Sequence, residues 1–72
     1  MAEKPLAARV LEALAKDKRT KNLAIDVSVV GAQVTLTGNV PSAKDRKVAE
    51  EVAHAVNGVA GVINEIRIAR VA

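Results

Sequence analysis

The stretch of residues 34–42 constrains the fold more than any other part of this chain, because it joins a strand pattern directly to a helix start. Apolar and polar residues alternate along it, which is typical of a strand with one buried face. Ser42 follows, and Asp45 stands at the spacing of a reciprocal capping box. The sequence therefore predicts a strand at about 33–40 that leads straight into a helix.

A second alternating segment at 23–29 is expected to pair with this strand as a hairpin. Gly31-Ala32 lies between the two, and a two-residue turn with glycine first is typically type II′. The resulting register pairs residues of like polarity: Val29 with Val34, Val27 with Leu36, Ser28 with Thr35, and Asp26 with Thr37. A slip of one residue would reverse both faces of the sheet.

A first helix is predicted at about residues 5–17. Its apolar stripe is formed at helical spacing by Leu6, Val10 and Leu14. Pro5 suits a first turn, where its missing N–H is not needed. Glu12 and Lys16 stand in the favourable i,i+4 order on the opposite face.

The second helix, which begins at Ser42, is expected to run to residue 57. Its inner stripe consists of Val48, Ala49, Val52, Ala55 and Val56. Its outer face carries Lys47, Glu50, Glu51 and His54. Asn57-Gly58 ends the helix, with Gly58 as the left-handed C′ residue.

A third strand is predicted at residues 62–70, with Ile66 and Ile68 facing inward. Asn64 has the same parity as these isoleucines. It is therefore either buried with hydrogen-bond partners or placed where the strand has not yet joined the sheet.

The predicted order is helix, strand, strand, helix, strand, which gives a single small α+β domain over residues 1–72 with its core at about 6–70. Two helices are expected on one face of a three-stranded sheet, with the other face polar and open. A right-handed parallel crossover would place the third strand beside the second in a mixed sheet. The polar face predicts a monomer or a weak oligomer.

The chain of 72 residues has no cysteine and no aromatic residue, and its formal net charge is +3. The missing cysteines exclude disulfides, thiolate metal sites and a thiol nucleophile. A core of Val, Ala, Leu and Ile must rely on many modest contacts, each about 1.5–3 kcal/mol for a fully buried large side chain. The mildly basic balance permits attraction to anionic surfaces.

Residues 1–14 do not have the form of a secretory signal, because Arg9 and Glu12 interrupt the apolar run. No segment approaches the roughly 20 apolar residues of a membrane-spanning helix. We therefore expect a soluble chain with no transmembrane segment, either a mature protein or a piece of a longer one.

Catalytic and metal sites are not predicted. His54 and Glu50 could supply two metal ligands, whereas zinc requires three or four, and the chain has no other histidine. Ser28 and Ser42 have no histidine at a suitable spacing, so no nucleophile–base pair is expected. We expect no enzyme, no metal and no cofactor.

These features together resemble the BON domain (bacterial OsmY and nodulation domain) over about residues 6–68. The resemblance rests on the element order, on segments 34–40 and 56–68, and on Gly38 and Gly58-Val59 at their positions in those segments. The family's common Asn/Asp-Gly hairpin tip is replaced by Gly31-Ala32. The resemblance implies a non-catalytic module of bacterial envelope and stress proteins, associated with phospholipid or membrane interfaces and without a cofactor.

The two family hallmarks have structural explanations. Gly38 is expected to face the core, where a missing side chain lets a helix approach closely. Gly58 is expected to stop the second helix, and Val59 to pack back on its last turn.

Basic residues at the end of the first helix are the best functional candidates: Lys16, Lys18, Arg19 and Lys21, together with Arg9. Lys44 and Lys47 could extend this patch, depending on how the helices lie. Such a group can hold an anionic lipid surface, although charged runs are also commonly just solvated. The open sheet face, with Asp26, Thr35, Thr37 and Arg67, is a second possible contact surface.

Three hypotheses follow for the function. The first is a binding module that contacts anionic phospholipid membranes or envelope proteins in the periplasm or cell envelope, with a cytoplasmic location left open. The second is a structural or assembly module that connects other domains or associates through the edge of the third strand. The third is KH-like RNA binding at Gly58-Val59-Ala60-Gly61, which is disfavoured because this segment leads into a strand and no aromatic ring can stack on a base.

Overall fold

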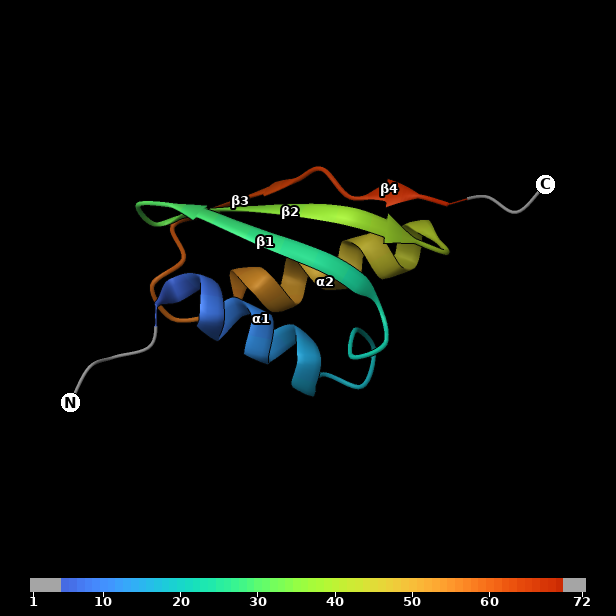
Figure 1. Ribbon diagram of the computed structural model, residues 1–72, viewed down its shortest axis with the longest axis horizontal. Coiled ribbons are helices and arrows are strands. Elements are labelled where there is room, and N and C mark those ends of the chain that lie inside the picture. Colours follow the sequence, from blue (N-terminus) through green and yellow to red (C-terminus); the bar gives the residue numbers. More distant parts are fainter. Residues whose placement is uncertain (1–4, 70–72) are drawn as a thin grey trace.

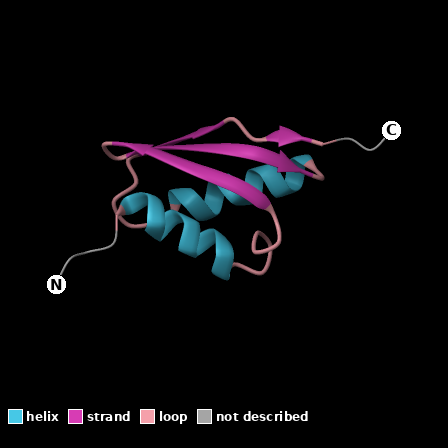
Figure 2. Ribbon diagram, viewed as in Figure 1, coloured by secondary structure: helices cyan, strands magenta, loops and turns pink. Residues whose placement is uncertain are grey.

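The structure is a computed structural model that describes residues 5–69. Its elements are α1 (Leu6–Lys16), β1 (Ala24–Val30), β2 (Gln33–Val40), α2 (Ala43–His54), β3 (Gly61–Asn64) and β4 (Arg67–Ile68). Both helices lie against one face of the sheet, and α1 runs beneath β1 (Figure 1, Figure 2). The predicted α+β class and element order are confirmed.

The β1–β2 hairpin has the predicted register, with all the expected pairs present in an antiparallel ladder. Gly31 has a φ of 62°, and no non-glycine residue among 5–69 has a positive φ. A type I′ turn needs positive φ at both central positions, so Gly31-Ala32 fits the predicted type II′ turn.

The third strand lies beside β2 and parallel to it, which confirms the mixed sheet, but the strand is not continuous. β3 and β4 both pair with β2 in parallel and in the same register. The strand predicted at 62–70 is thus a single strand with a gap at Glu65 and Ile66. Residue 70 lies outside the described residues.

Asn64 explains the gap. Its Oδ1 accepts a hydrogen bond from the Ile66 N–H at 3.1 Å, which is an Asx turn that bends the chain locally. Its Nδ2 donates to the carbonyl of Arg46 at 3.0 Å and to Glu50 Oε1 at 3.2 Å, both on α2. Of the two alternatives for Asn64, the one with hydrogen-bond partners is correct, and the side chain is half-buried. Its hydrogen bonds connect the third strand to α2.

The prediction that Gly38 makes room for a helix is wrong. Gly38 has a φ of 133°, and a Cβ there would collide with the carbonyl oxygen of Ala24 and lie 3.3 Å from the Ile25 Cα. The close neighbour is therefore the backbone of β1, not a helix. Gly38 is needed because two strands approach each other closely at this point.

α2 begins as predicted but ends earlier. The Ser42 Oγ accepts from the Asp45 N–H at 3.2 Å and donates to Asp45 Oδ2 at 3.0 Å, so the reciprocal bond reaches the hydroxyl rather than the Ser42 backbone. The helix stops at His54, not near residue 57. The predicted inner stripe included Ala55, but Ala55 is exposed and Ala53 is buried instead.

Gly58 is not the C′ residue of α2, since Ala55 already caps the helix. Gly58 has a φ of 97°, and a Cβ there would lie 3.2 Å from Arg9 Nη2 and 3.7 Å from Leu6 Cδ1. The turn therefore passes close to the start of α1. Val59 is half-buried and packs against the aliphatic core.

The core lies between the sheet and the helices and is entirely aliphatic. Its buried members are Val10, Leu14, Val34, Leu36, Val40, Val48, Ala49, Val52, Ala53 and Ile66. The central strand β2 supplies three of the largest fully buried side chains, Val34, Leu36 and Val40, because it is flanked by a strand on both edges.

Gly38→Ala should destabilise the protein by about 2–4 kcal/mol, because the new methyl group meets β1 backbone in a conformation that L-residues rarely adopt. Urea unfolding followed by circular dichroism measures this change. Gly61→Ala is the matched control, since Gly61 has no atom near its Cβ position and no positive φ. Equal stability of the two variants would show that the close contact is unimportant.

Candidate functional site

The predicted basic residues gather where α1 ends and the chain turns toward β1. Thr20 anchors this turn: it is 2% exposed, and its Oγ1 donates to the Leu14 carbonyl at 2.6 Å. The N–H groups of Thr20 and Lys21 both donate to the Asp17 carbonyl, at 3.0 and 2.8 Å. The turn therefore has a defined shape rather than being a free tail. Sequence analysis missed Thr20, because nothing local distinguishes it from a solvated threonine.

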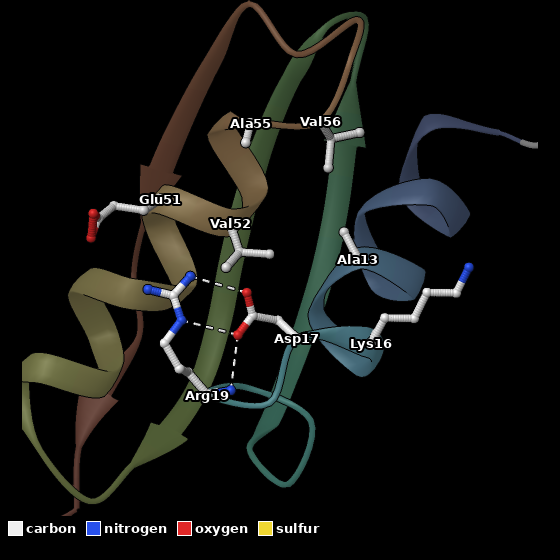
Figure 3. A pocket seen from close by; sticks show the side chains of 8 residues that line it. All are labelled: Ala13, Lys16, Asp17, Arg19, Glu51, Val52, Ala55 and Val56. Atoms are coloured by element: carbon white, nitrogen blue, oxygen red, sulfur yellow. Dashed lines mark hydrogen bonds and ion pairs between the residues drawn. The ribbon is translucent and has the colours of Figure 1, made fainter.

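Asp17 and Arg19 form a tight pair within this turn. Asp17 Oδ1 accepts from the Arg19 N–H at 2.8 Å and from Arg19 Nε at 3.1 Å, while Arg19 Nη2 donates to Asp17 Oδ2 at 3.0 Å (Figure 3). The side-chain hydrogen bonds from Arg19 lower the pKa of Asp17 below its ordinary 3.8, and the same bonds raise the pKa of Arg19. Arg19 thus carries its charge in an exposed but oriented position.

The other cations of the turn are exposed. Lys16 Nζ lies 3.3 Å from Glu12 Oε1, and its side chain is 77% exposed, so the i,i+4 pair expected from the sequence is present. Lys18 and Lys21 are exposed and form no salt bridge with any residue among 5–69. Because exposed pairs contribute little energy, Lys16 and Arg19 can exchange partners readily.

Arg9 stands apart from the turn along α1, although it lines a shallow hollow together with Lys16. It lies two helical turns before Lys16, about 10 Å along α1, beside Gly58. Its Nε is buried and has no hydrogen-bond partner among residues 5–69. We therefore define the basic segment as residues 16–21 and leave Arg9 outside it. Lys44 and Lys47 are exposed on the first turns of α2.

A shallow groove of about 560 Å³ runs from this turn across to α2 (Figure 3). Its floor is apolar and its rim is charged: it is lined by Ala13, Lys16, Asp17, Arg19, Glu51, Val52, Ala55 and Val56. The rim carries both signs, with Asp17 and Glu51 as acids and Lys16 and Arg19 as bases, so the groove does not select an anion strongly. The groove could not be predicted from the sequence, because its lining residues come from two helices and their arrangement depends on how these helices cross.

The net charge of the protein resides in the basic segment. Of 11 basic and 8 acidic residues in the chain, residues 16–21 hold four basic and one acidic. The remaining seven of each sign cancel, so the formal charge of +3 equals that of this one segment. An electrostatic partner would therefore meet the molecule at one end.

The described residues offer little for other chemistry. His54 is exposed at the end of α2, and no group of three or more His, Cys, Asp or Glu side chains among residues 5–69 could hold a metal ion. The part of the chain that the structure describes has no helix long and apolar enough to cross a bilayer. Gly58-Val59-Ala60-Gly61 lies between α2 and the start of β3. In KH proteins a loop of this GxxG pattern clamps the nucleic-acid backbone.

Comparison with protein families matches the BON domain to residues 2–70, nearly the whole chain. The chain belongs to the BON domain family. BON domains are generally non-catalytic binding modules. Comparison with curated proteins finds no match.

In this BON domain the family hallmarks are structural. Gly38 lets β1 and β2 approach each other, and Gly58 lets the turn after α2 approach α1. Neither glycine lies in the basic segment, so the residues that mark the family and the residues that carry its charge are separate.

The Asp17–Arg19 pair should make stability depend on pH. Because folding lowers the pKa of Asp17, its contribution is fully present above the unfolded value of about 3.9 and is lost as pH falls through the lower folded value. Asp17→Asn should therefore reduce stability at pH 7 more than at pH 3, measured by urea unfolding. An equal loss at both pH values would contradict the pairing.

Proposed function

We propose that this BON domain binds anionic phospholipid surfaces through the basic segment. The observation that carries the proposal is the concentration of the entire formal net charge in residues 16–21, whose four basic residues are exposed where α1 ends. Family membership supports the proposal, since BON domains are associated with periplasmic or envelope proteins, where such surfaces are available.

The segment is suited to a membrane because its charges are held on a defined turn. Lys18 and Lys21 are already unpaired among the described residues, and Lys16 and Arg19 can point to headgroup phosphates while keeping part of their present pairing. The Thr20 hydroxyl keeps the turn folded against Leu14. Little ordering entropy is therefore lost when the segment meets a surface.

The expected affinity is low. A basic residue near an anionic headgroup layer contributes about 1 kcal/mol, so a net charge of +3 supplies roughly 3 kcal/mol, less than a millimolar dissociation constant requires. One domain alone would bind reversibly and with strong dependence on salt. Stable attachment would need a second binding site on the same assembly, because linked sites raise the overall affinity without new contacts.

The double substitution Lys18→Ala, Lys21→Ala should weaken binding to phosphatidylglycerol-containing vesicles by about 20- to 30-fold, from the loss of two contributions of about 1 kcal/mol. Vesicle co-sedimentation at low salt measures the change, with phosphatidylcholine vesicles as the neutral surface. The matched control is Arg46→Ala, Arg67→Ala, which removes the same charge from the far side of α2 and from the open sheet face.

The control variant should bind within about threefold of the wild type, since neither residue lies near the basic segment. An equal loss in both variants would mean that total charge, not this turn, is responsible. Negligible wild-type binding to both kinds of vesicle would remove the lipid role.

A further inference from the structure

β1 is an exposed edge strand of unusual continuity for so small a sheet. It runs uninterrupted over Ala24–Val30, paired on one side with β2 and on the other with nothing among the described residues. The opposite edge, which the second of the three hypotheses uses for association, is divided by the Asn64 turn. Proteins usually protect edges with lysine, proline or bulges, and β1 has none of these; Asp26 is its only charged residue.

The backbone groups free at this edge can be identified. The carbonyls of Leu36 and Val40 accept from the third strand, at 2.8 Å each, so the even-numbered residues of β2 bond in that direction. Its odd-numbered residues therefore bond to the even-numbered residues of β1. It follows that the N–H and C=O groups of Val27 and Val29 point outward. The Ile25 N–H already donates to the Leu23 carbonyl at 3.1 Å.

Apolar side chains accompany this free edge. Val27 and Val29 face the helices but are only half-buried, whereas their partners on β2, Val34 and Leu36, are fully buried. Leu11 on α1 is 44% exposed. Because Arg9 and Ala13 line the groove toward α2 and residues are 100° apart around a helix, Leu11 lies on the opposite flank. The flank and the edge are on the same side, since α1 runs beneath β1 (Figure 1).

We propose that this edge binds the same edge of a second copy of the chain, antiparallel, about a two-fold axis at Val27. In that register Val27 faces Val27 of the second copy, Asp26 faces Ser28, Ile25 faces Val29, and Ala24 faces Val30. Every pair matches in polarity. The outward N–H and C=O groups of Val27 pair with those of Val27 in the second copy, and the Val29 N–H donates to the Ile25 carbonyl, while the Ile25 N–H keeps its bond to the Leu23 carbonyl. The two sheets become one, and the Leu11 flanks of the two α1 helices face each other.

Charge selects this register over its neighbours. The outward backbone groups belong to odd-numbered residues, so alternative registers differ by two residues. A shift one way places Asp26 opposite Asp26 of the second copy, which is repulsive. A shift the other way places Asp26 opposite Val30 and shortens the ladder. Only the register centred on Val27 pairs the whole strand and gives each Asp26 carboxylate a serine hydroxyl as its neighbour.

Sedimentation velocity on the full chain tests the proposal, with concentration raised from about 10 µM to about 1 mM because so short an edge buries less than a standard interface. The mass should rise from monomer toward dimer over this range. Ser28→Glu should weaken the dimer and Ser28→Lys should strengthen it, each by about fivefold, since position 28 faces Asp26 of the other copy twice in each dimer.

Gln33→Glu and Gln33→Lys are matched controls, because Gln33 is exposed on the same face but lies on β2. They should leave the association unchanged. As a second measure, the amide exchange of Val27 and Val29 should slow as concentration rises. A chain that stays monomeric at the highest concentration, or Ser28 variants that shift the association in the same direction, would overturn the proposal and leave the edge to another partner.

Discussion

The pairing of β1 with β2 in one polarity-matched register is the constraint on which the rest of the structure depends. With Val27 opposite Leu36 and Val29 opposite Val34, the buried apolar partners fall on one face, and both helices lie against that face. Gly38 lets β1 come close enough for this ladder to form. The same pairing places α1 beneath β1, which sets the basic segment at one end of the molecule and leaves one strand edge free.

The features that depend on neighbouring residues were predictable from the sequence. Alternation defined the hairpin and its register, and the turn type followed from glycine at its first position. The Ser42 cap defined the start of α2. The basic segment was also visible, because its residues are close together in the chain. What the sequence could not show was its pairing state: Asp17 holds Arg19, while Lys18 and Lys21 have no salt-bridge partner in the described chain.

The features that depend on distant residues were missed or misassigned. Asn64 finds its partners on α2, 14 and 18 residues earlier in the chain. The functions of Gly38 and Gly58 depend on which backbone or side chain lies opposite. At the end of α2, Ala53 and Ala55 differ in burial although alanine is compatible with either environment.

Residue-resolved hydrogen exchange along β1, at low micromolar concentration where an edge-paired dimer is dissociated, tests the register most directly. The amides of Asp26 and Ser28 should be protected, because they donate to β2, and those of Val27 and Val29 should exchange quickly, because they face solvent. Protection of Val27 and Val29 with rapid exchange at Asp26 and Ser28 would mean that the ladder is shifted by one residue, and the account of this fold would be wrong.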